Sequence, residues 1–200
     1  MISRWQDVRR DQARRKVLNL IPQGALCAEI GVWKGDFSQQ ILDTGKVREL
    51  FLIDPWRFAP HFPARLYGGL VAKSQTEMDE IFLAVERRFS GKGVQVIRKP
   101  SLDAAETFPD SSFDWVYIDG DHYCKAVLDD LSAWFPKARP GGFVVLDDYD
   151  WRDAANGNIF SVREAIDVFI NGKSFSFAKP LKGQFVIQKE ANIPGRKLFE

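Results

Sequence analysis

Five ionisable side chains directly follow two apolar runs of the sequence. They are Asp119, Asp121, His122, Asp147 and Asp148. The two runs, residues 113–118 and 143–146, have the length of buried strands, and a helix-length segment separates them. A strand, a helix and a second strand in this order form a right-handed crossover, so both strand ends open onto one edge of a parallel sheet. Because ligands of open α/β sheets bind at that edge, we expect these side chains to form an active site.

Three of these carboxylates, those of Asp119, Asp147 and Asp148, have the chemistry of a metal site. Clustered carboxylates repel one another unless some are protonated or a cation lies among them. Oxygen ligands suit Mg²⁺, Mn²⁺ or Ca²⁺, and water or a substrate hydroxyl can fill the remaining positions. The alternative is structural, because aspartates at strand ends also cap helices and bind loop amides. Asp148 in particular fits a loop residue.

His122 is one of only two histidines and follows Asp119 by three residues. A histidine near its unperturbed pKa can take a proton from a hydroxyl group at neutral pH, so we predict that His122 is a general base. The alternative is a histidine that caps the helix. Asp121 is expected to orient His122 or to N-cap the following helix, and we leave it out of the metal set.

A second candidate site precedes these residues in the chain. The loop Glu-Ile-Gly-Val-Trp-Lys-Gly at 29–35 follows an apolar strand, and its glycines, Gly31 and Gly35, permit a sharp turn and the close approach of a ligand. The pattern lacks the third glycine of the dinucleotide fingerprint, which disfavours an NAD-linked oxidoreductase. Asp54 ends the next strand about 20 residues later, where a ribose diol is typically held. The alternative for Asp54 is a turn aspartate before Pro55.

The elements that must position these groups alternate along the chain. The predicted strands are 25–30, 50–53, 94–97, 113–118, 143–146, 173–179 and 184–188. The predicted helices are 2–20, one with Phe37, Ile41 and Leu42 that ends at Gly45, one with Met78 to Phe89, 101–108 with Ser101 as N-cap, one with Val127 to Phe135, and one with Val162 to Phe169. Pro140-Gly141-Gly142 and residues 180–183 are predicted turns. This order indicates an α/β sandwich with a mostly parallel sheet and an antiparallel hairpin at its edge.

Composition bounds the class of protein. The 200 residues predict a helix at 1–24, one domain at 25–190 and a tail at 191–200. The 28 basic and 27 acidic residues nearly cancel, which argues against nucleic acid or a membrane surface as partner. Basic residues crowd the amino terminus, where a solvated helix face is favoured over a patch for an anionic partner. They are Arg4, Arg9, Arg10, Arg14, Arg15 and Lys16.

Two further features concern the compartment. Cys27 and Cys124 are the only cysteines and are expected to be reduced thiols. No apolar stretch reaches the roughly 18–20 residues of a membrane span, and the start lacks a hydrophobic signal region. We therefore expect a cytoplasmic protein.

Four motifs in this order resemble those of class I S-adenosylmethionine-dependent methyltransferases. They are E-I-G-V-W-K-G, Asp54, F-D-W-V-Y-I-D-G-D-H and R-P-G-G-F-V-V-L-D-D-Y. The resemblance covers roughly residues 25–190 and is strongest to the small metal-dependent O-methyltransferases that include sugar-modifying enzymes of macrolide biosynthesis. It implies a Rossmann-like three-layer sandwich whose mostly parallel seven-stranded sheet ends in an antiparallel hairpin.

The resemblance also implies roles for individual residues. Gly31 and Gly35 would lie against the methionine part of S-adenosylmethionine and Glu29 near its amino group. Asp54 would hold the ribose and Ser101 the adenine end. The remaining residues at the strand ends would serve the reaction, with Asp119 beside the cofactor and in a Mg²⁺ site with Asp147 and Asp148, and His122 as the base.

The implied reaction is methylation of a hydroxyl group on a sugar or other small natural product. Loops 55–74, which contains His61, and 149–160 are expected to shape the acceptor site. The partner would be this small molecule, with no nucleic acid or membrane, and self-association stays open. Two alternatives remain: a hydroxylase-like enzyme of the same branch, and a non-catalytic nucleoside-binding module.

Overall fold

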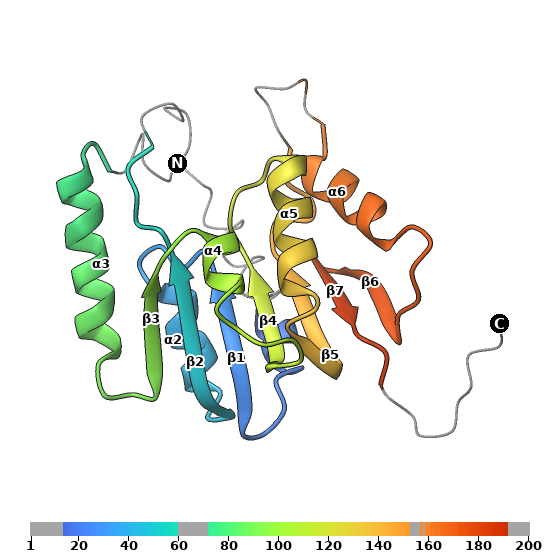
Figure 1. The fold of residues 1–200 in the computed structure, drawn as a ribbon, viewed down its shortest axis with the longest axis horizontal. Coiled ribbons are helices and arrows are strands. Elements are labelled where there is room, and N and C mark those ends of the chain that lie inside the picture. Colours follow the sequence, from blue (N-terminus) through green and yellow to red (C-terminus); the bar gives the residue numbers. More distant parts are fainter. Residues whose placement is uncertain (1–13, 60–71, 153–156, 158, 192–200) are drawn as a thin grey trace.

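A computed structural model describes residues 14–59, 72–152, 157 and 159–191, and its centre is one seven-stranded sheet (Figure 1). The strands are β1 (Ala25–Ile30), β2 (Val47–Asp54), β3 (Val94–Arg98), β4 (Phe113–Ile118), β5 (Ala138–Leu146), β6 (Phe177–Leu181) and β7 (Gln184–Gln188). Their order is β3-β2-β1-β4-β5-β7-β6. Strands β1 to β5 pair in parallel, whereas β7 is antiparallel to both β5 and β6. The predicted fold class, a mostly parallel sheet with a hairpin at its edge, is confirmed.

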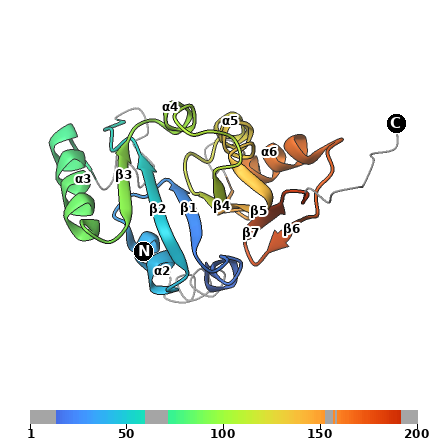
Figure 2. The ribbon, with the colours of Figure 1, turned by 60° about the horizontal axis from the view of Figure 1, so that its bottom comes forward.

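Helices cover both faces of the sheet and make three layers (Figure 2). They are α2 (Asp36–Asp43), α3 (Gln75–Phe89), α4 (Ser101–Ala105), α5 (Cys124–Trp134) and α6 (Ser161–Ile170). The last three pack on one face, and α2, α3 and the helical residues 14–18 pack on the other. The remainder of the predicted helix 2–20 lies outside the described residues. None of the helices described is long and apolar enough to cross a membrane.

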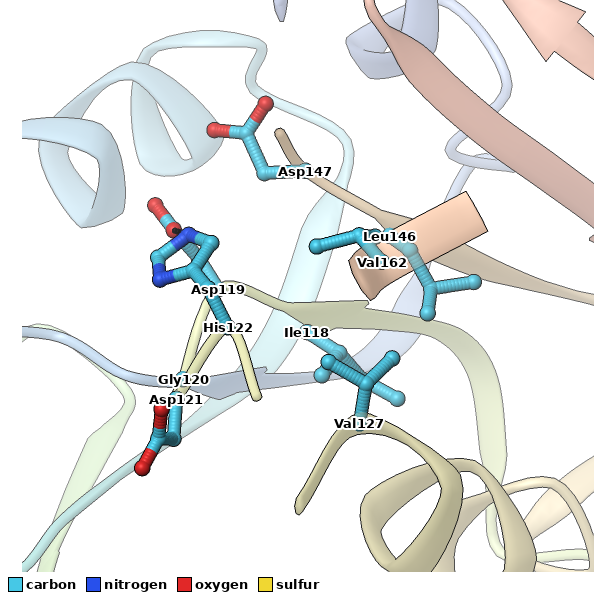
Figure 3. Close-up of a pocket in the computed structure, with 9 residues that line it drawn as sticks. All are labelled: Ile118, Asp119, Gly120, Asp121, His122, Val127, Leu146, Asp147 and Val162. Atoms are coloured by element: carbon cyan, nitrogen blue, oxygen red, sulfur yellow. Dashed lines mark ion pairs between the residues drawn. The ribbon is translucent and has the colours of Figure 1, made fainter. Parts of the chain in front are cut away.

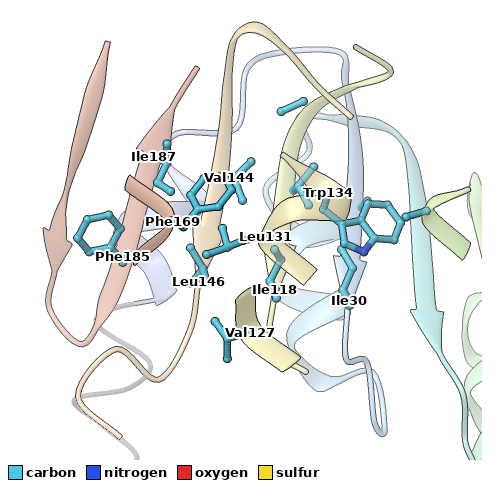
Figure 4. Close-up of a cluster of buried hydrophobic side chains, with 14 of the residues drawn as sticks. Ile30, Ile118, Val127, Leu131, Trp134, Val144, Leu146, Phe169, Phe185 and Ile187 are labelled. Carbon is cyan, nitrogen blue, oxygen red and sulfur yellow. The ribbon is translucent and has the colours of Figure 1, made fainter. Parts of the chain in front are cut away.

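Side chains of the central strands alternate between two buried clusters. In β4, Val116 and Ile118 face the cluster that contains Leu131 and Trp134 of α5 (Figure 4). Trp115 of the same strand faces the opposite cluster. Burial on both faces explains why these strands are almost continuously apolar. Cys27 and Cys124 are free thiols, as predicted.

The predicted turn at Pro140-Gly141-Gly142 is wrong, because these residues lie inside β5. The Gly141 amide donates to the Lys189 carbonyl (3.0 Å), and the Lys189 amide donates to the Gly142 carbonyl (2.9 Å). The pairing of β4 with β5 shifts register at this point, so the segment forms a bulge. A Cβ on Gly142 would lie 3.0 Å from the Asp114 carbonyl oxygen, which leaves glycine as the fitting residue.

Several element boundaries also differ from the prediction: β2 is longer than 50–53, α4 ends before residue 108, and β6 begins later than residue 173. The N-cap of α4 is Pro100, and Ser101 is its first helical residue, so the predicted N-cap role of Ser101 is wrong. The hairpin turn is shorter than 180–183: Lys182 and Gly183 alone connect β6 to β7, both with positive φ. A two-residue turn of this kind matches the twist of paired strands. Pro180 is tolerated in β6 because β6 is an edge strand of the sheet.

Candidate active site

The ends of β4 and β5 bring the predicted acidic residues together. The amide of Asp119 donates to the Ile30 carbonyl (2.7 Å), and that of Asp147 donates to the Ile118 carbonyl (3.0 Å), so the parallel ladder continues just past the apolar runs. A small pocket lies between these ends, next to α5 and α6 (Figure 3). It is lined by Ile118, Asp119, Gly120, Asp121, His122, Val127, Leu146, Asp147 and Val162.

Arg14 is the cation of this carboxylate cluster, and sequence reasoning missed it. Its Nη2 donates to Asp119 Oδ2 (2.8 Å) and to Asp147 Oδ2 (2.7 Å), and its Nε donates to Asp147 Oδ2 (3.2 Å). Arg14 is only 8% exposed, so the predicted solvated helix face is wrong for this residue. The available signal was its spacing, because Arg14 precedes the buried Val17 and Leu18 by three and four residues and therefore shares their helix face.

Asp147 is held through both carboxylate oxygens. In addition to Arg14 on Oδ2, the Gln184 amide donates to Oδ1 (3.2 Å) and to the Tyr117 hydroxyl (2.9 Å). Burial raises the pKa of Asp147, but the Arg14 charge and the hydrogen bonds from Tyr117 and Arg14 together lower it below its usual value. The pKa of Asp119 is raised instead, first by burial and then by repulsion from Asp147 and Asp148. The two carboxylates are therefore in different electrostatic environments.

His122 pairs with Asp148. The distance from His122 Nε2 to Asp148 Oδ2 is 2.8 Å, and that to Asp119 Oδ1 is 3.9 Å. Asp148 itself has a φ of 52°, a left-handed conformation that aspartate tolerates better than most residues. The ring of Trp151 lies 5.2 Å from the imidazole ring. A histidine with a carboxylate on one ring nitrogen has a defined orientation and tautomer.

Asp121 has a separate role. Its Oδ1 accepts a hydrogen bond from the Tyr123 amide (3.1 Å), and its carboxylate points away from the His122 ring (Figure 3). The N-cap of α5 is Tyr123, so the expectation that Asp121 is the N-cap is wrong. Asp121 instead fixes the turn that leads into the helix.

Within the described part of the chain, one group of side chains has the spacing of a metal site. Ligand atoms of Asp119, His122 and Asp148 all lie within 4.8 Å of one another. This group shares two residues with the predicted set and contains His122 in place of Asp147. Carboxylates suit Mg²⁺ and Mn²⁺, and imidazole extends the range toward softer divalent ions.

The glycines of the 29–35 loop are required by packing within the chain. Gly31 has a φ of 88°, and a Cβ there would lie 1.9 Å from the Asp119 carbonyl oxygen. A Cβ on Gly35 would lie 2.5 Å from the Phe89 ring. Gly31 therefore lets the first loop contact the end of β4. From the sequence, these glycines are explained by a sharp turn and the close approach of a ligand, and not by packing within the chain.

The acidic residues around this loop are engaged with the chain. Glu29 is buried, and the Ser38 hydroxyl donates to its Oε2 (2.5 Å). Asp54 Oδ2 accepts from the amides of Val32 and Trp33 (3.0 and 2.9 Å), and its Oδ1 accepts from the Trp56 amide (2.8 Å). Asp54 thus fixes the conformation of the glycine loop, in keeping with the turn role considered for it.

Ser101 lies against α5 rather than in the loop cluster. Its hydroxyl donates to Asp130 Oδ1 (2.5 Å) and accepts from Trp134 Nε1 (2.8 Å). Burial raises the pKa of Asp130 to about 6, although the bond from Ser101 opposes this. Asp130 is not among the residues predicted from the sequence. Its spacing of three from Val127 and four from Trp134 places it on the apolar face of the helix, which was the available signal.

Glu29 provides a test of the buried environment through the pH dependence of stability. Burial raises its pKa to about 8, with the Ser38 hydroxyl and Arg14 opposing the shift. The unfolded chain loses this proton near its ordinary pKa of about 4.3. Between these two pKa values the folded chain binds more protons than the unfolded chain. The free energy of unfolding therefore falls as pH rises through this range, by at most about 1.4 kcal/mol per pH unit, and Glu29 adds no further pH dependence above it.

We expect Glu29→Gln to remove this fall of the free energy of unfolding with rising pH. Urea unfolding at pH 5, 6, 7 and 8 should show the variant gaining stability over the wild type as pH rises. The same substitution at the exposed Glu86 is the control and should give parallel curves. Parallel curves for Glu29→Gln would contradict a protonated Glu29 in the folded chain.

Comparison with known proteins identifies the family. A family model described as a methyltransferase domain matches residues 28–149, more than half of the chain. Uncharacterized protein R132 of Acanthamoeba polyphaga mimivirus is 28% identical over 130 residues, which are 62% of this chain and 52% of that protein. The chain therefore spans about half the length of this curated relative.

Solved structures share the fold. The SAH-bound methyltransferase PaMTH1 of Podospora anserina has a TM-score of 0.63 at 14% identity, over 95% of this chain and 80% of that one. A Staphylococcus aureus structure provisionally named as a caffeoyl-CoA O-methyltransferase has a TM-score of 0.61 at 13% identity, over 94% and 85%. The chain belongs to the methyltransferase domain family and has the class I methyltransferase fold.

Proposed function

We propose that the chain is an S-adenosylmethionine-dependent O-methyltransferase that acts on a hydroxyl group of a sugar or other small natural product, with the assistance of a divalent cation. The observation that carries the proposal is the His122–Asp148 pair beside Asp119, at the strand edge where this fold class binds ligands. Family membership and the SAH-bound neighbour support the cofactor. The name of the Staphylococcus neighbour supports an oxygen acceptor.

The cofactor would lie along the ends of β1, β2 and β4. In the proposal Gly31 and Gly35 face its methionine part, Glu29 its amino group and Asp54 its ribose. Ser101 and Asp119 complete the set, toward the adenine and the reacting centre. The fit rests on the loop itself, which has no side chain at Gly31 and Gly35 and is fixed by hydrogen bonds from the Val32 and Trp33 amides to Asp54. A loop held in this way is pre-organised, which lowers the entropic cost of binding.

The proposed reaction is an in-line displacement. S-adenosylmethionine would supply the methyl group: the acceptor oxygen would form a bond to the methyl carbon while the bond from that carbon to sulfur breaks, and the electron pair would stay on sulfur in the product S-adenosylhomocysteine. Holding the two reactants at attack distance would supply most of the catalysis, since it lowers the activation barrier by of order 7–11 kcal/mol in favourable models. The remaining task is removal of the hydroxyl proton.

In the proposal His122 takes that proton. Asp148 lies 2.8 Å from Nε2 and orients the imidazole, and the tautomer decides which ring nitrogen accepts the proton. As the proton arrives, the Asp148 carboxylate stabilises the imidazolium, as in other histidine–aspartate pairs. The carboxylate also prevents the ring from turning.

A divalent cation fits beside this pair. Mg²⁺ is often bound by only one or two carboxylates with several waters, and Asp119 and Asp148 would supply these two. When bound, such an ion would orient the acceptor hydroxyl and lower its pKa. His122 would remain next to it as the base.

Binding and transfer experiments test the proposal separately. Calorimetry with S-adenosylhomocysteine should show saturable binding, and the ligand should raise the unfolding temperature. Transfer of a labelled methyl group to a panel of hydroxylated sugars and phenols, with Mg²⁺ or with chelator, tests the reaction. Binding without transfer to any acceptor would favour a nucleoside-binding module, and oxidation of an acceptor would favour the hydroxylase-like alternative.

A further inference from the structure

We propose that Arg14 is a positioning residue that sorts the carboxylates of this site into ligands and non-ligands of a divalent cation. Its ion pair prevents Asp147 from acting as a ligand, whereas Asp119 and Asp148, beside His122, remain able to bind a cation. This inference rests on the metal half of the proposed function. It concerns which side chains can be ligands, and it can be tested by metal binding without methyl transfer.

The guanidinium of Arg14 supplies positive charge to this carboxylate cluster. Three carboxylates at neighbouring strand ends need a cation among them. Arg14 provides one, since its guanidinium forms ion pairs with Asp119 and Asp147 while 8% exposed. Its Cζ also lies 4.6 Å from the centroid of the Phe37 ring, which adds a cation–π contact. The single positive charge of Arg14 thus compensates one of the three negative charges and is shared between Asp119 and Asp147.

Both carboxylate oxygens of Asp147 already accept hydrogen bonds from the chain. Asp147 Oδ2 accepts from two nitrogens of Arg14, and its Oδ1 accepts from Gln184. A cation that bound Asp147 would have to displace a buried, bidentate guanidinium. Breaking such a pair is costly, because it leaves a charge buried without its partner.

The carboxylate of Asp119 is oriented with one oxygen toward Arg14 and the other toward His122. Arg14 binds its Oδ2, which leaves Oδ1 on the side of His122, 3.9 Å from Nε2. Asp148 lies on the same side, with its side chain 42% exposed, whereas that of Asp147 is 5% exposed. The accessible carboxylate oxygens therefore belong to Asp119 and Asp148.

The experiment compares two isosteric substitutions, Asp147→Asn and Asp148→Asn, in Mn²⁺ titrations of the full chain without cofactor. Asp148→Asn should weaken Mn²⁺ binding by at least about 10-fold, as expected for loss of a ligand, and Asp147→Asn by much less. Thermal unfolding confirms that both variants fold. Equal losses in the two variants would overturn the inference.

Arg14→Met, alone and with Asp147→Asn, provides the second test. Without the guanidinium, Asp147 becomes available, so Mn²⁺ should bind more tightly, and Asp147→Asn should now cost about 10-fold or more. The conservative variant Arg14→Lys keeps the charge and should keep Asp147 closed. A small effect of Asp147→Asn in both backgrounds would contradict the sorting role. If Arg14→Met does not fold, the two aspartate variants decide.

The outcomes separate this inference from the proposed function. Mn²⁺ binding by Arg14→Met but not by the wild type would overturn the inference, because Asp119 and Asp148 would then not form a cation site beside an intact Arg14–Asp147 pair. Absence of Mn²⁺ binding in every variant would overturn the inference. In both cases S-adenosylhomocysteine titrations of the same samples report on the cofactor half independently.

Discussion

Replacing His122 with alanine is expected to lower kcat by about 10²–10⁴-fold, the usual contribution of a general base. The imidazole lies 2.8 Å from the Asp148 carboxylate, at the edge of the sheet where the acceptor would bind. S-adenosylhomocysteine affinity should stay within about twofold, because all the residues proposed to hold the cofactor except Asp119 are on other loops. The measurement is labelled methyl transfer beside calorimetric binding, in the same buffer.

Two matched variants separate proton transfer from orientation. His122→Gln keeps a side-chain donor toward Asp148 but no group that takes a proton, so it should be as inactive as His122→Ala. Asp148→Asn keeps the imidazole but loses the carboxylate that fixes its tautomer, which is costly in related histidine–aspartate pairs. Activity of His122→Ala near that of the wild type would remove His122 from the reaction and leave it as a structural residue.

The sequence predicts the central part of this site because the information there is local. Asp119 and Asp147 each follow an apolar run, and parallel strands joined by a helix must end at the same edge. The positions of both residues, and of His122 between them, follow from the order of elements alone. The pairing of His122 with Asp148 depends on the left-handed backbone at Asp148, which the sequence does not reveal.

The cation of the cluster could not be predicted in this way. Arg14 is separated from Asp119 by 105 residues and from Asp147 by 133. Its helix packs on the sheet through apolar residues such as Val17, and their contacts decide which basic side chain is buried. The sequence indicates that the carboxylates need a cation, and it predicts a metal ion in that role. Six basic residues lie in the same amino-terminal segment, and the sequence does not show which of them enters the cluster.

Backbone contacts between distant segments account for the other differences. Pro140-Gly141-Gly142 has the composition of a turn, yet pairing with Lys189 keeps it in the sheet. A turn propensity is a weak preference, and a ladder of hydrogen bonds with a neighbouring strand overrides it. The same reasoning applies to Gly31, whose requirement for glycine comes from a residue 88 positions away in the chain.

Gly31→Ala is expected to lower the free energy of unfolding by about 3 to 5 kcal/mol, in the range of the most damaging single substitutions. Its φ of 88° disfavours any side chain, and the added Cβ would lie 1.9 Å from the Asp119 carbonyl oxygen. Because the clash is with backbone, neither side can rotate away. The strand end that carries Asp119 must shift, so any folded variant should also lose Mn²⁺ affinity.

Gly45→Ala is the control for Gly31→Ala. Its φ of 65° is also left-handed, but a Cβ there meets nothing within 4 Å, so only the conformational cost of about 1–2 kcal/mol should appear. Urea unfolding of the two variants measures the difference directly. Equal losses would mean that backbone conformation alone requires glycine at position 31. A larger loss for Gly31→Ala would assign the excess to the contact that joins the glycine loop to the catalytic strand end.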